Sequence, residues 1–178
     1  MIDLTKHVLP DAIIVDGRAF RIKTDFTHWI NFSQKIDERA PLLDFDYIYI
    51  EEKPEDRAAG FNELMTFFIN KRELPHVRES GSHEKFLDYT LDADLIFAAF
   101  WQQYQIDLVE IKHLHWWKFQ ALLFGLKDTK LAEVKSFRGY DENDKTSYKD
   151  YMKRQREAWK IDTPDPEAQR ILEKFNAL

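Results

Sequence analysis

The spacing of apolar residues divides the chain into a short hairpin followed by helices. Residues 12–22 place Asp16-Gly17 between two β-prone runs, which is a strong signal for a two-residue hairpin turn. Later segments space their apolar residues three and four apart, as amphipathic helices do. These segments cover about residues 26–37, the stretch that begins at Pro54, about 92–104 and about 129–138.

Three further segments have patterns of their own. Residues 110–125 are apolar nearly all round, which is typical of a central buried helix. Residues 42–50 alternate like a strand, yet the run is short enough for a buried helical turn, and both alternatives stay open. Residues 75–90, with Glu79-Ser80-Gly81-Ser82, are expected to form a long loop. The whole pattern predicts a mainly α fold: a compact helical domain with a small N-terminal β-hairpin.

The last part of the chain differs in composition. Residues 141–178 hold nine acidic and eight basic residues, and this shift predicts a helical domain over 1–140 and a charged helical arm over 141–178. Within the arm we expect a helix over about 147–160, with Ser147-x-x-Asp150 as its capping box, and a short helix after Pro166. The first helix carries a stripe of larger side chains, which are Tyr148, Tyr151, Met152 and Trp159.

The stripe on the arm has two interpretations. The helix either folds back onto the rest of the protein, or it presents these side chains to another protein. Tyr, Trp and Met are enriched at protein interfaces, so we predict Tyr148, Tyr151, Met152 and Trp159 as partner-binding residues. Periodicity alone does not separate the two interpretations.

Composition and charge exclude several classes of function. The chain of 178 residues has no cysteine, which excludes disulfides and thiolate chemistry, and its 5 glycines make a phosphate-binding loop hard to place. The net charge of −6 disfavours binding to nucleic acid. With neither a secretory signal core nor a membrane span in the sequence, we expect a cytoplasmic protein. Residues 37–57 carry a local balance of −5, either as a solvated surface or as a docking patch for a basic partner.

Candidate chemical groups are few. His113-x-His115 is the most metal-like pair, but on a helix these two side chains point apart. Two carboxylate pairs, Asp92-x-Asp94 and Asp44-x-Asp46, lack a third acid, and Asp92 is well explained as a helix cap. The sequence therefore predicts no catalytic residue, no metal site and no cofactor.

Two consecutive motifs resemble a known phage family. They are Asp92-Ala-Asp-Leu-Ile-Phe-Ala-Ala-Phe-Trp-Gln-Gln-Tyr-Gln-Ile-Asp-Leu108 and Leu114-His-Trp-Trp-Lys-Phe-Gln-Ala-Leu-Leu-Phe-Gly-Leu126. This tandem is similar to the bacteriophage family called gene product fifteen, from siphophages and prophages of Gram-positive bacteria. Further similarity lies in the hairpin that leads into Thr24-Asp25-Phe26, in Ser136-Phe-Arg-Gly-Tyr-Asp141 and in the basic helix that ends at Trp159.

The resemblance implies a protein encoded between the major tail protein and the tape-measure protein. Proteins from that position are regarded as tail assembly chaperones, which keep the tape-measure protein soluble and recruit tail-tube subunits. The expected partners are therefore the tape-measure protein, the major tail (tube) protein and further copies of the chain as a homo-oligomer. The expected place is the host cytoplasm during assembly rather than the mature virion. The resemblance carries over no catalytic residue.

Two other classes of function remain open at this level. The protein can be a structural tail or connector component that stays in the virion, and virion composition distinguishes this from a chaperone. It can also be a small hydrolase or metal enzyme built on His113, His115 and nearby acids, which metal analysis of the purified protein tests.

Overall fold

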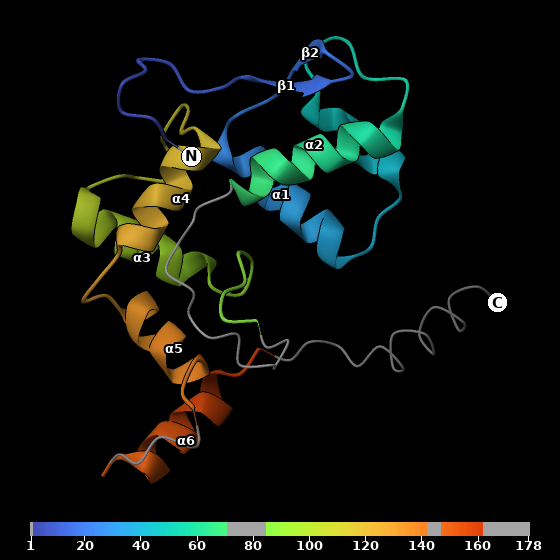
Figure 1. Ribbon diagram of the computed structural model, residues 1–178. Helices are drawn as coiled ribbons and strands as arrows, with labels where there is room; N and C mark the ends of the chain where they lie inside the picture. Colours follow the sequence, from blue (N-terminus) through green and yellow to red (C-terminus); the bar gives the residue numbers. More distant parts are fainter. Residues whose placement is uncertain (1, 71–84, 142–146, 162–178) are drawn as a thin grey trace, which may run out of the picture.

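The computed structural model describes residues 2–70, 85–141 and 147–161. In these ranges the chain forms two strands and seven helices, one of them a 3-10 helix, which confirms the predicted mainly α fold with a small N-terminal hairpin (Figure 1). The predicted loop around Ser80 and the helix after Pro166 lie outside the described residues. The elements are β1 (Ala12–Val15), β2 (Arg18–Arg21), α1 (Phe26–Asp37), η1 (Leu42–Ile48), α2 (Arg57–Ile69), α3 (Ala93–Tyr104), α4 (Trp116–Gly125), α5 (Lys130–Arg138) and α6 (Lys149–Trp159).

The N-terminal hairpin forms where Asp16-Gly17 predicts it. Both turn residues have positive φ, 50° for Asp16 and 78° for Gly17, as the turn of a two-residue hairpin requires. Strand β1 pairs antiparallel with β2, and its residues Ile13 and Val15 face inward. An isolated two-stranded hairpin is marginal in water. Here the hairpin packs against α2, and this contact supplies the buried face that the hairpin lacks alone (Figure 1).

Residues 42–50 combine both structures that their pattern allows. Leu42–Ile48 forms the 3-10 helix η1, with Phe45 and Ile48 buried. Directly after it, Tyr49 forms a bridge to Ile22, and the amide of Ile50 donates to the carbonyl of Arg21 at 3.1 Å. The end of this segment therefore runs beside the end of the hairpin through an isolated bridge, without forming a strand of the sheet.

Helix α2 begins later than the sequence predicts. Pro54 is not its first residue; the helix starts at Arg57, and the carboxylate of Asp56 accepts from the amides of Ala58 and Ala59, both at 2.9 Å. Pro54 instead packs against Gly60 inside the helix. The proline thus packs the segment before α2 against the helix and does not begin the helix.

Aromatic rings from four helices form the core. Trp29 of α1 stacks on Phe67 of α2, with ring centroids 4.8 Å apart. Trp116 and Phe119 of α4 continue the stack, and Phe119 lies 5.2 Å from Phe100 of α3. Offset stacking of this kind adds to the free energy of simple burial. The core therefore joins α1, α2, α3 and α4 into one packed body.

Helix α4 is neither as long nor as uniformly buried as predicted. It begins at Trp116 rather than near residue 110, and its buried side consists of Trp116, Phe119 and Leu123. Phe124, on the other side, is 62% exposed. The apolar pattern predicts burial all round the helix, but α4 packs against the rest of the protein on one side only, so its other side is exposed.

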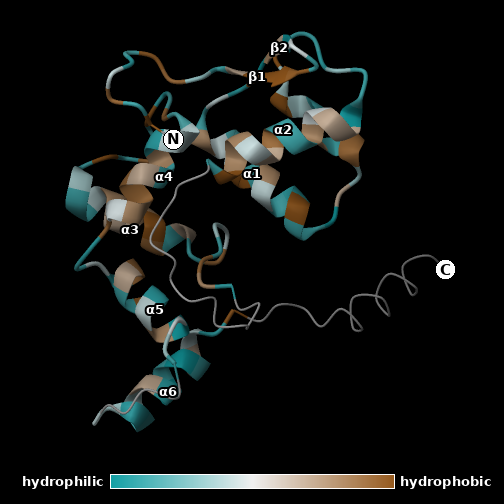
Figure 2. Ribbon diagram, viewed as in Figure 1, coloured by the Kyte–Doolittle hydropathy of each residue, from teal (hydrophilic) through white to brown (hydrophobic). Residues whose placement is uncertain are grey.

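The last two helices lie to one side of this body (Figure 1). Helix α5 packs against α3, and α6 packs against α5. Helix α6 is mainly hydrophilic and has no buried residue (Figure 2). It starts at Lys149 with Tyr148 in the cap position and no side-chain cap, so the predicted capping box from Ser147 to Asp150 is wrong. The predicted division at residue 140 remains a prediction.

Candidate partner-binding surface on the C-terminal arm

Helix α6 folds back along α5 through aromatic contacts. The ring of Tyr151 meets Phe137 edge to face, with centroids 6.1 Å apart. At the other end of α6, the ammonium group of Lys130 lies 5.5 Å from the centre of the Trp159 ring, within the range of a cation–π contact. One side of the predicted stripe is thus used for packing within the protein.

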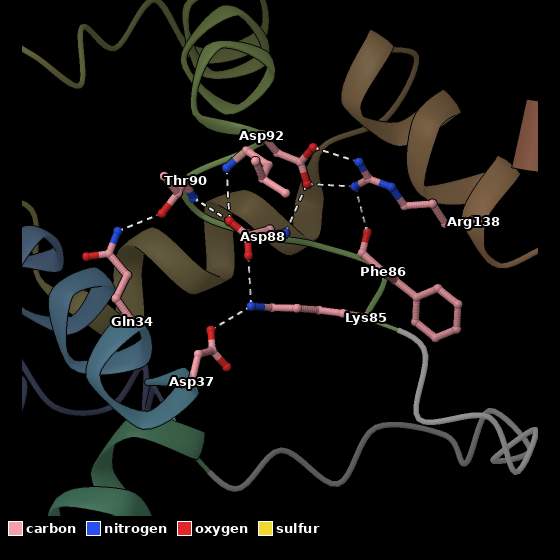
Figure 3. Close-up of polar contacts among 9 residues, drawn as sticks. Gln34, Asp37, Lys85, Phe86, Asp88, Thr90, Asp92 and Arg138 are labelled. Atoms are coloured by element: carbon pink, nitrogen blue, oxygen red, sulfur yellow. Dashed lines mark hydrogen bonds and ion pairs between the residues drawn. The ribbon is translucent and has the colours of Figure 1, made fainter. Parts of the chain in front are cut away.

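A buried arginine fixes the geometry between these helices and the body (Figure 3). The guanidinium of Arg138, at the end of α5, donates Nη1 to Asp92 Oδ2 at 2.6 Å and Nη2 to Asp92 Oδ1 at 2.9 Å. Nη1 also donates to the carbonyl of Phe86, and Nε donates to the carbonyl of Trp159 at 2.7 Å. Arg138 and Asp92 are 7% and 2% exposed, so this is a fully paired buried ion pair.

The structure corrects the expected role of Asp92. The residue occupies the N-cap position of α3, but its side chain makes no capping hydrogen bond to that helix. Its carboxylate instead binds Arg138 and accepts from the amide of Asp88 at 2.9 Å. Asp94, its partner in the predicted carboxylate pair, is exposed in the first turn of α3.

A second ionic contact lies beside Asp92 (Figure 3). The ammonium group of Lys85 donates to Asp37 at 2.6 Å and to Asp88 at 2.9 Å. Burial lowers the pKa of Lys85, but hydrogen bonds and charge from both carboxylates outweigh burial, so its pKa lies above the ordinary value. Burial raises the pKa of Asp88, and bonds from the Leu91 amide and Lys85 outweigh this and lower it. Both groups are charged and serve to tie α1 to the segment before α3.

The start of α6 and the end of α5 enclose an open concavity of about 590 Å³. We name it the arm concavity; its lining residues are Ser136, Gly139, Tyr140, Asp141, Tyr148, Tyr151 and Met152. Tyr148 is 71% exposed and Tyr151 is 44% exposed, so both rings are accessible from solvent. The result is a hollow with aromatic and thioether walls and one carboxylate.

The structure brings together three of the four predicted partner-binding residues. Tyr148, Tyr151 and Met152 line the arm concavity, whereas Trp159 lies at the far end of α6 beside Lys130. Sequence reasoning missed the wall formed by the end of α5 and the residues after it, namely Ser136, Gly139 and Tyr140. The sequence feature that could have pointed to this wall is the motif from Ser136 to Asp141, which contains the residues of the wall.

The two histidines of the metal-like pair bind different parts of the protein. His113 Nε2 lies 3.1 Å from the hydroxyl of Thr24, and His115 Nε2 lies 3.0 Å from the carbonyl of Pro10. His115 Nδ1 accepts from the amide of Trp117 at 3.1 Å, so its neutral ring caps α4. Burial lowers the pKa of His115, against a smaller opposite effect of the Pro10 bond. In the part of the chain that the structure describes, no three His, Asp or Glu side chains group as metal ligands would.

The other carboxylate pair is also occupied by neighbouring cations. Asp46 contacts Lys53 at 2.6 Å and Arg57 at 3.1 Å. Asp44 lies 3.8 Å from Lys35. The two carboxylates of the predicted pair therefore face different cations, and this arrangement links η1 to its neighbours.

The Trp-Trp pair that follows His115 has a structural role. The last carbonyls of any α-helix lack partners within that helix. Here the indole of Trp117 donates to the carbonyl of Phe67, and the indole of Trp116 donates to that of Phe68, both at 2.9 Å. The motif thus caps the end of α2 from α4.

Comparison with known proteins identifies one family. The family model described as Bacteriophage Gp15 protein matches residues 6–161, which spans every described element from β1 to α6. No curated protein and no solved structure matches the chain. Among the described residues, none of the helices has the length and apolar character needed to cross a membrane.

Proposed function

The chain belongs to the Bacteriophage Gp15 protein family, and from this premise we propose that it is a tail assembly chaperone without enzymatic activity. It binds the tape-measure protein in the host cytoplasm, keeps it soluble and helps to recruit the major tail (tube) protein. It leaves the assembly before the virion is complete.

The arm concavity is the observation that carries this proposal. A chaperone for a long apolar client needs exposed apolar side chains that remain hydrated in the absence of the client. Tyr148 and Tyr151 meet this need, because each combines an apolar ring with a polar hydroxyl and both are exposed. Met152 adds a flexible thioether that adapts to different client side chains.

Charged residues around the concavity support the same function. Lys149, Asp150 and Arg154 are exposed on α6, and Asp141 lies in the lining itself. Charge around an apolar patch limits non-specific self-association of the free protein. An apolar side chain of the client enters between the tyrosine rings, while the surrounding charges stay in water.

Co-expression with tape-measure segments tests the proposal. We expect the wild-type protein to raise the soluble yield of these segments, and the double variant Tyr148→Ser/Tyr151→Ser to raise it far less. The client loses two aromatic contacts in this variant. Helix α6 also loses the contact of Tyr151 with Phe137, but it keeps the contacts of Trp159 with Lys130 and Arg138. Circular dichroism of the purified variant checks that its helices are intact.

The matched control is Trp101→Ser, which removes an aromatic ring that is 49% exposed on α3, outside the concavity. It should leave the soluble yield at the wild-type level. An equal loss in both variants would assign the effect to general surface hydrophobicity, and no effect of the wild-type protein on the client would refute the chaperone role. Mass spectrometry of purified virions separates this role from that of a retained structural component, because a chaperone should be missing from them.

A further inference from the structure

Strand β1 has an edge that the rest of the described chain leaves open. Because the hairpin turn has two residues, Val15 and Arg18 form a hydrogen-bonded pair, and such pairs alternate along an antiparallel ladder. The amides and carbonyls of Ala12 and Ile14 therefore point away from β2. No other described residue donates to these groups or accepts from them. The outer side of β1 is thus a row of backbone groups without partners in the described part of the chain.

The other edge of the hairpin is covered. On the outer side of β2, the carbonyl of Arg21 accepts from the amide of Ile50 at 3.1 Å. An open edge is normally protected by charge, proline or a bulge within the strand. Strand β1 has none of these, and its Ile14 side chain is 56% exposed. Its edge therefore has the features of a strand that pairs with another chain.

A hollow lies where β1 ends. Its volume is about 490 Å³, and it is formed by the hairpin and the segment 51–56. The buried side chains of Val15, Phe20 and Pro54 contribute apolar walls. Five of its ten lining residues are acidic and two are basic. The open edge of β1 therefore leads to an acidic hollow.

The negative charge of this hollow is only partly balanced. Its two bases already bind carboxylates, one that of Glu52 and the other that of Asp46. Asp16 and Glu55 are exposed and form no ion pair with any described residue. A cation placed beyond the end of β1 is therefore attracted by carboxylates that the described chain does not neutralise.

We propose that β1 binds an extended segment of a partner protein, which adds a strand to the hairpin and carries a lysine or arginine at one end. Ala12 and Ile14 each exchange two hydrogen bonds with this strand in an antiparallel ladder, the more stable of the two pairings. Apolar side chains of the partner pack beside Ile14 on the exposed face. The residues that precede the partner's apolar run then lie at the turn, where their cation meets Asp16 and Glu55.

Charge distinguishes this partner from a second copy of the chain. A second β1 would bring its own Asp11 and Asp16 to an edge that is already acidic, and the whole chain has a net charge of −6. Complementary charge favours a basic segment instead. The inference is independent of the proposed chaperone function, because the hairpin lies at the other end of the molecule from the arm concavity (Figure 1).

An NMR titration of the full-length protein with a defined peptide tests this site. The probe is acetyl-Lys-Lys-Thr-Val-Thr-Val-Thr-amide. One control peptide has Glu-Glu in place of Lys-Lys, and the other has the two lysines after the last threonine. We expect saturable shifts of the Ala12 and Ile14 amide signals and slower hydrogen exchange of both amides in the complex. The Glu-Glu peptide should bind about tenfold more weakly and the peptide with C-terminal lysines about threefold more weakly.

Two pairs of variants make the result specific. Ile14→Pro removes an outward amide of β1 without removing a bond to β2, and it should abolish saturable binding, whereas Ala19→Pro, at an outward amide of β2, should not. Asp16→Asn keeps a residue that suits the turn and should weaken binding about threefold, the effect of one exposed ion pair. Glu110→Gln, an exposed acid outside the hairpin, should leave the affinity unchanged. Thermal melts check that each variant is folded.

Three results would overturn the proposal. The first is the absence of a saturable shift at Ala12 and Ile14, and the second is equal binding of the Glu-Glu peptide. The third is an equal effect of the two proline variants in folded protein. Protection of the same two amides that rises with protein concentration, in the absence of peptide, would assign the edge to a second copy and overturn it as well.

Discussion

At the scale of single residues, Arg138 has the largest influence on the position of the arm. Its guanidinium joins the end of α5 to Asp92, to the carbonyl of Phe86 and to the carbonyl of Trp159. The ion pair with Asp92 lies in a region where unpaired charge is costly. The arrangement depends on the planar, forked shape of arginine, which a lysine does not reproduce.

Arg138→Met should therefore destabilise the protein by about 3–5 kcal/mol, because it leaves the Asp92 carboxylate buried without a positive charge beside it. Urea denaturation followed by circular dichroism measures this loss. The double variant Asp92→Leu/Arg138→Met removes both charges and should recover much of the stability. A double variant as unstable as the single one would show that the buried charge of Asp92 is not the cause.

His115 makes stability depend on pH. Its folded pKa lies below the ordinary 6.5, so the folded protein binds its proton less readily than the unfolded chain does. The contribution of neutral His115 to the free energy of unfolding is complete above about pH 6.5, and it is lost as pH falls through the folded pKa. Protonation also removes the acceptor that caps α4. His28 has a lowered pKa, chiefly from burial, and adds an effect of the same sign.

We expect His115→Asn to flatten the dependence of the melting temperature on pH between about pH 5 and 7, since asparagine caps a helix without titrating in this range. Thermal melts across that range measure the slope. His7→Asn, at an exposed position, is the control and should keep the wild-type slope. An unchanged slope in His115→Asn would assign the acid sensitivity to other groups.

At the scale of elements, α2 shows how a contact overrides helix propensity. Alanine normally stabilises a helix interior by about 0.5–1 kcal/mol relative to glycine. At Gly60, however, an added Cβ would lie 2.6 Å from both Pro54 Cγ and Tyr49 Oη. The missing side chain is what lets the segment before α2 fold against the helix.

Gly60→Ala should therefore destabilise the protein by about 1–3 kcal/mol, in the range of overpacked sites, instead of stabilising it. Chemical denaturation gives the free energy of unfolding. Ala58→Gly, an exposed position in the same helix, should follow propensity and lose about 0.5–1 kcal/mol. A stabilised Gly60→Ala would mean that Pro54 does not pack on α2 in solution.

The same elements show what the sequence can predict. The start of α1 and the extent of α5 follow from local signals, because Asp25 and Thr129 cap their helices with their own side chains. The start of α2 does not follow from local signals, because Pro54 packs against Gly60 instead of beginning the helix. At the candidate site, helical spacing identifies Tyr148, Tyr151 and Met152 as one face. Their neighbours on α5 depend on how two helices fold together, which no local pattern contains.

At the scale of the whole molecule, the described part of the arm is attached chiefly through α5. Helix α6 has no buried residue and packs mainly on α5, while the aromatic core lies within α1 to α4. Most of the stability of the body should therefore not depend on α6. The bond from Arg138 to the carbonyl of Trp159 is the chief exception.

A chain that ends after residue 141 should keep a cooperative thermal transition, with a melting temperature below that of a chain ending after residue 161. The shorter chain loses the partner of Arg138 Nε but none of the buried aromatic rings. Calorimetry and tryptophan fluorescence compare the two chains. Loss of the cooperative transition in the shorter chain would show that the predicted domain boundary at residue 140 is wrong.

The capping of α2 by the tryptophans of α4 also bears on the order of folding during synthesis. The donors for the last carbonyls of α2 come 48 and 50 residues later in the chain. While the ribosome is still translating the segment between them, the C-terminal end of α2 has no indole partner. We therefore expect the nascent N-terminal half to remain incompletely folded until α4 emerges, when the hairpin, α1 and α2 consolidate in one step.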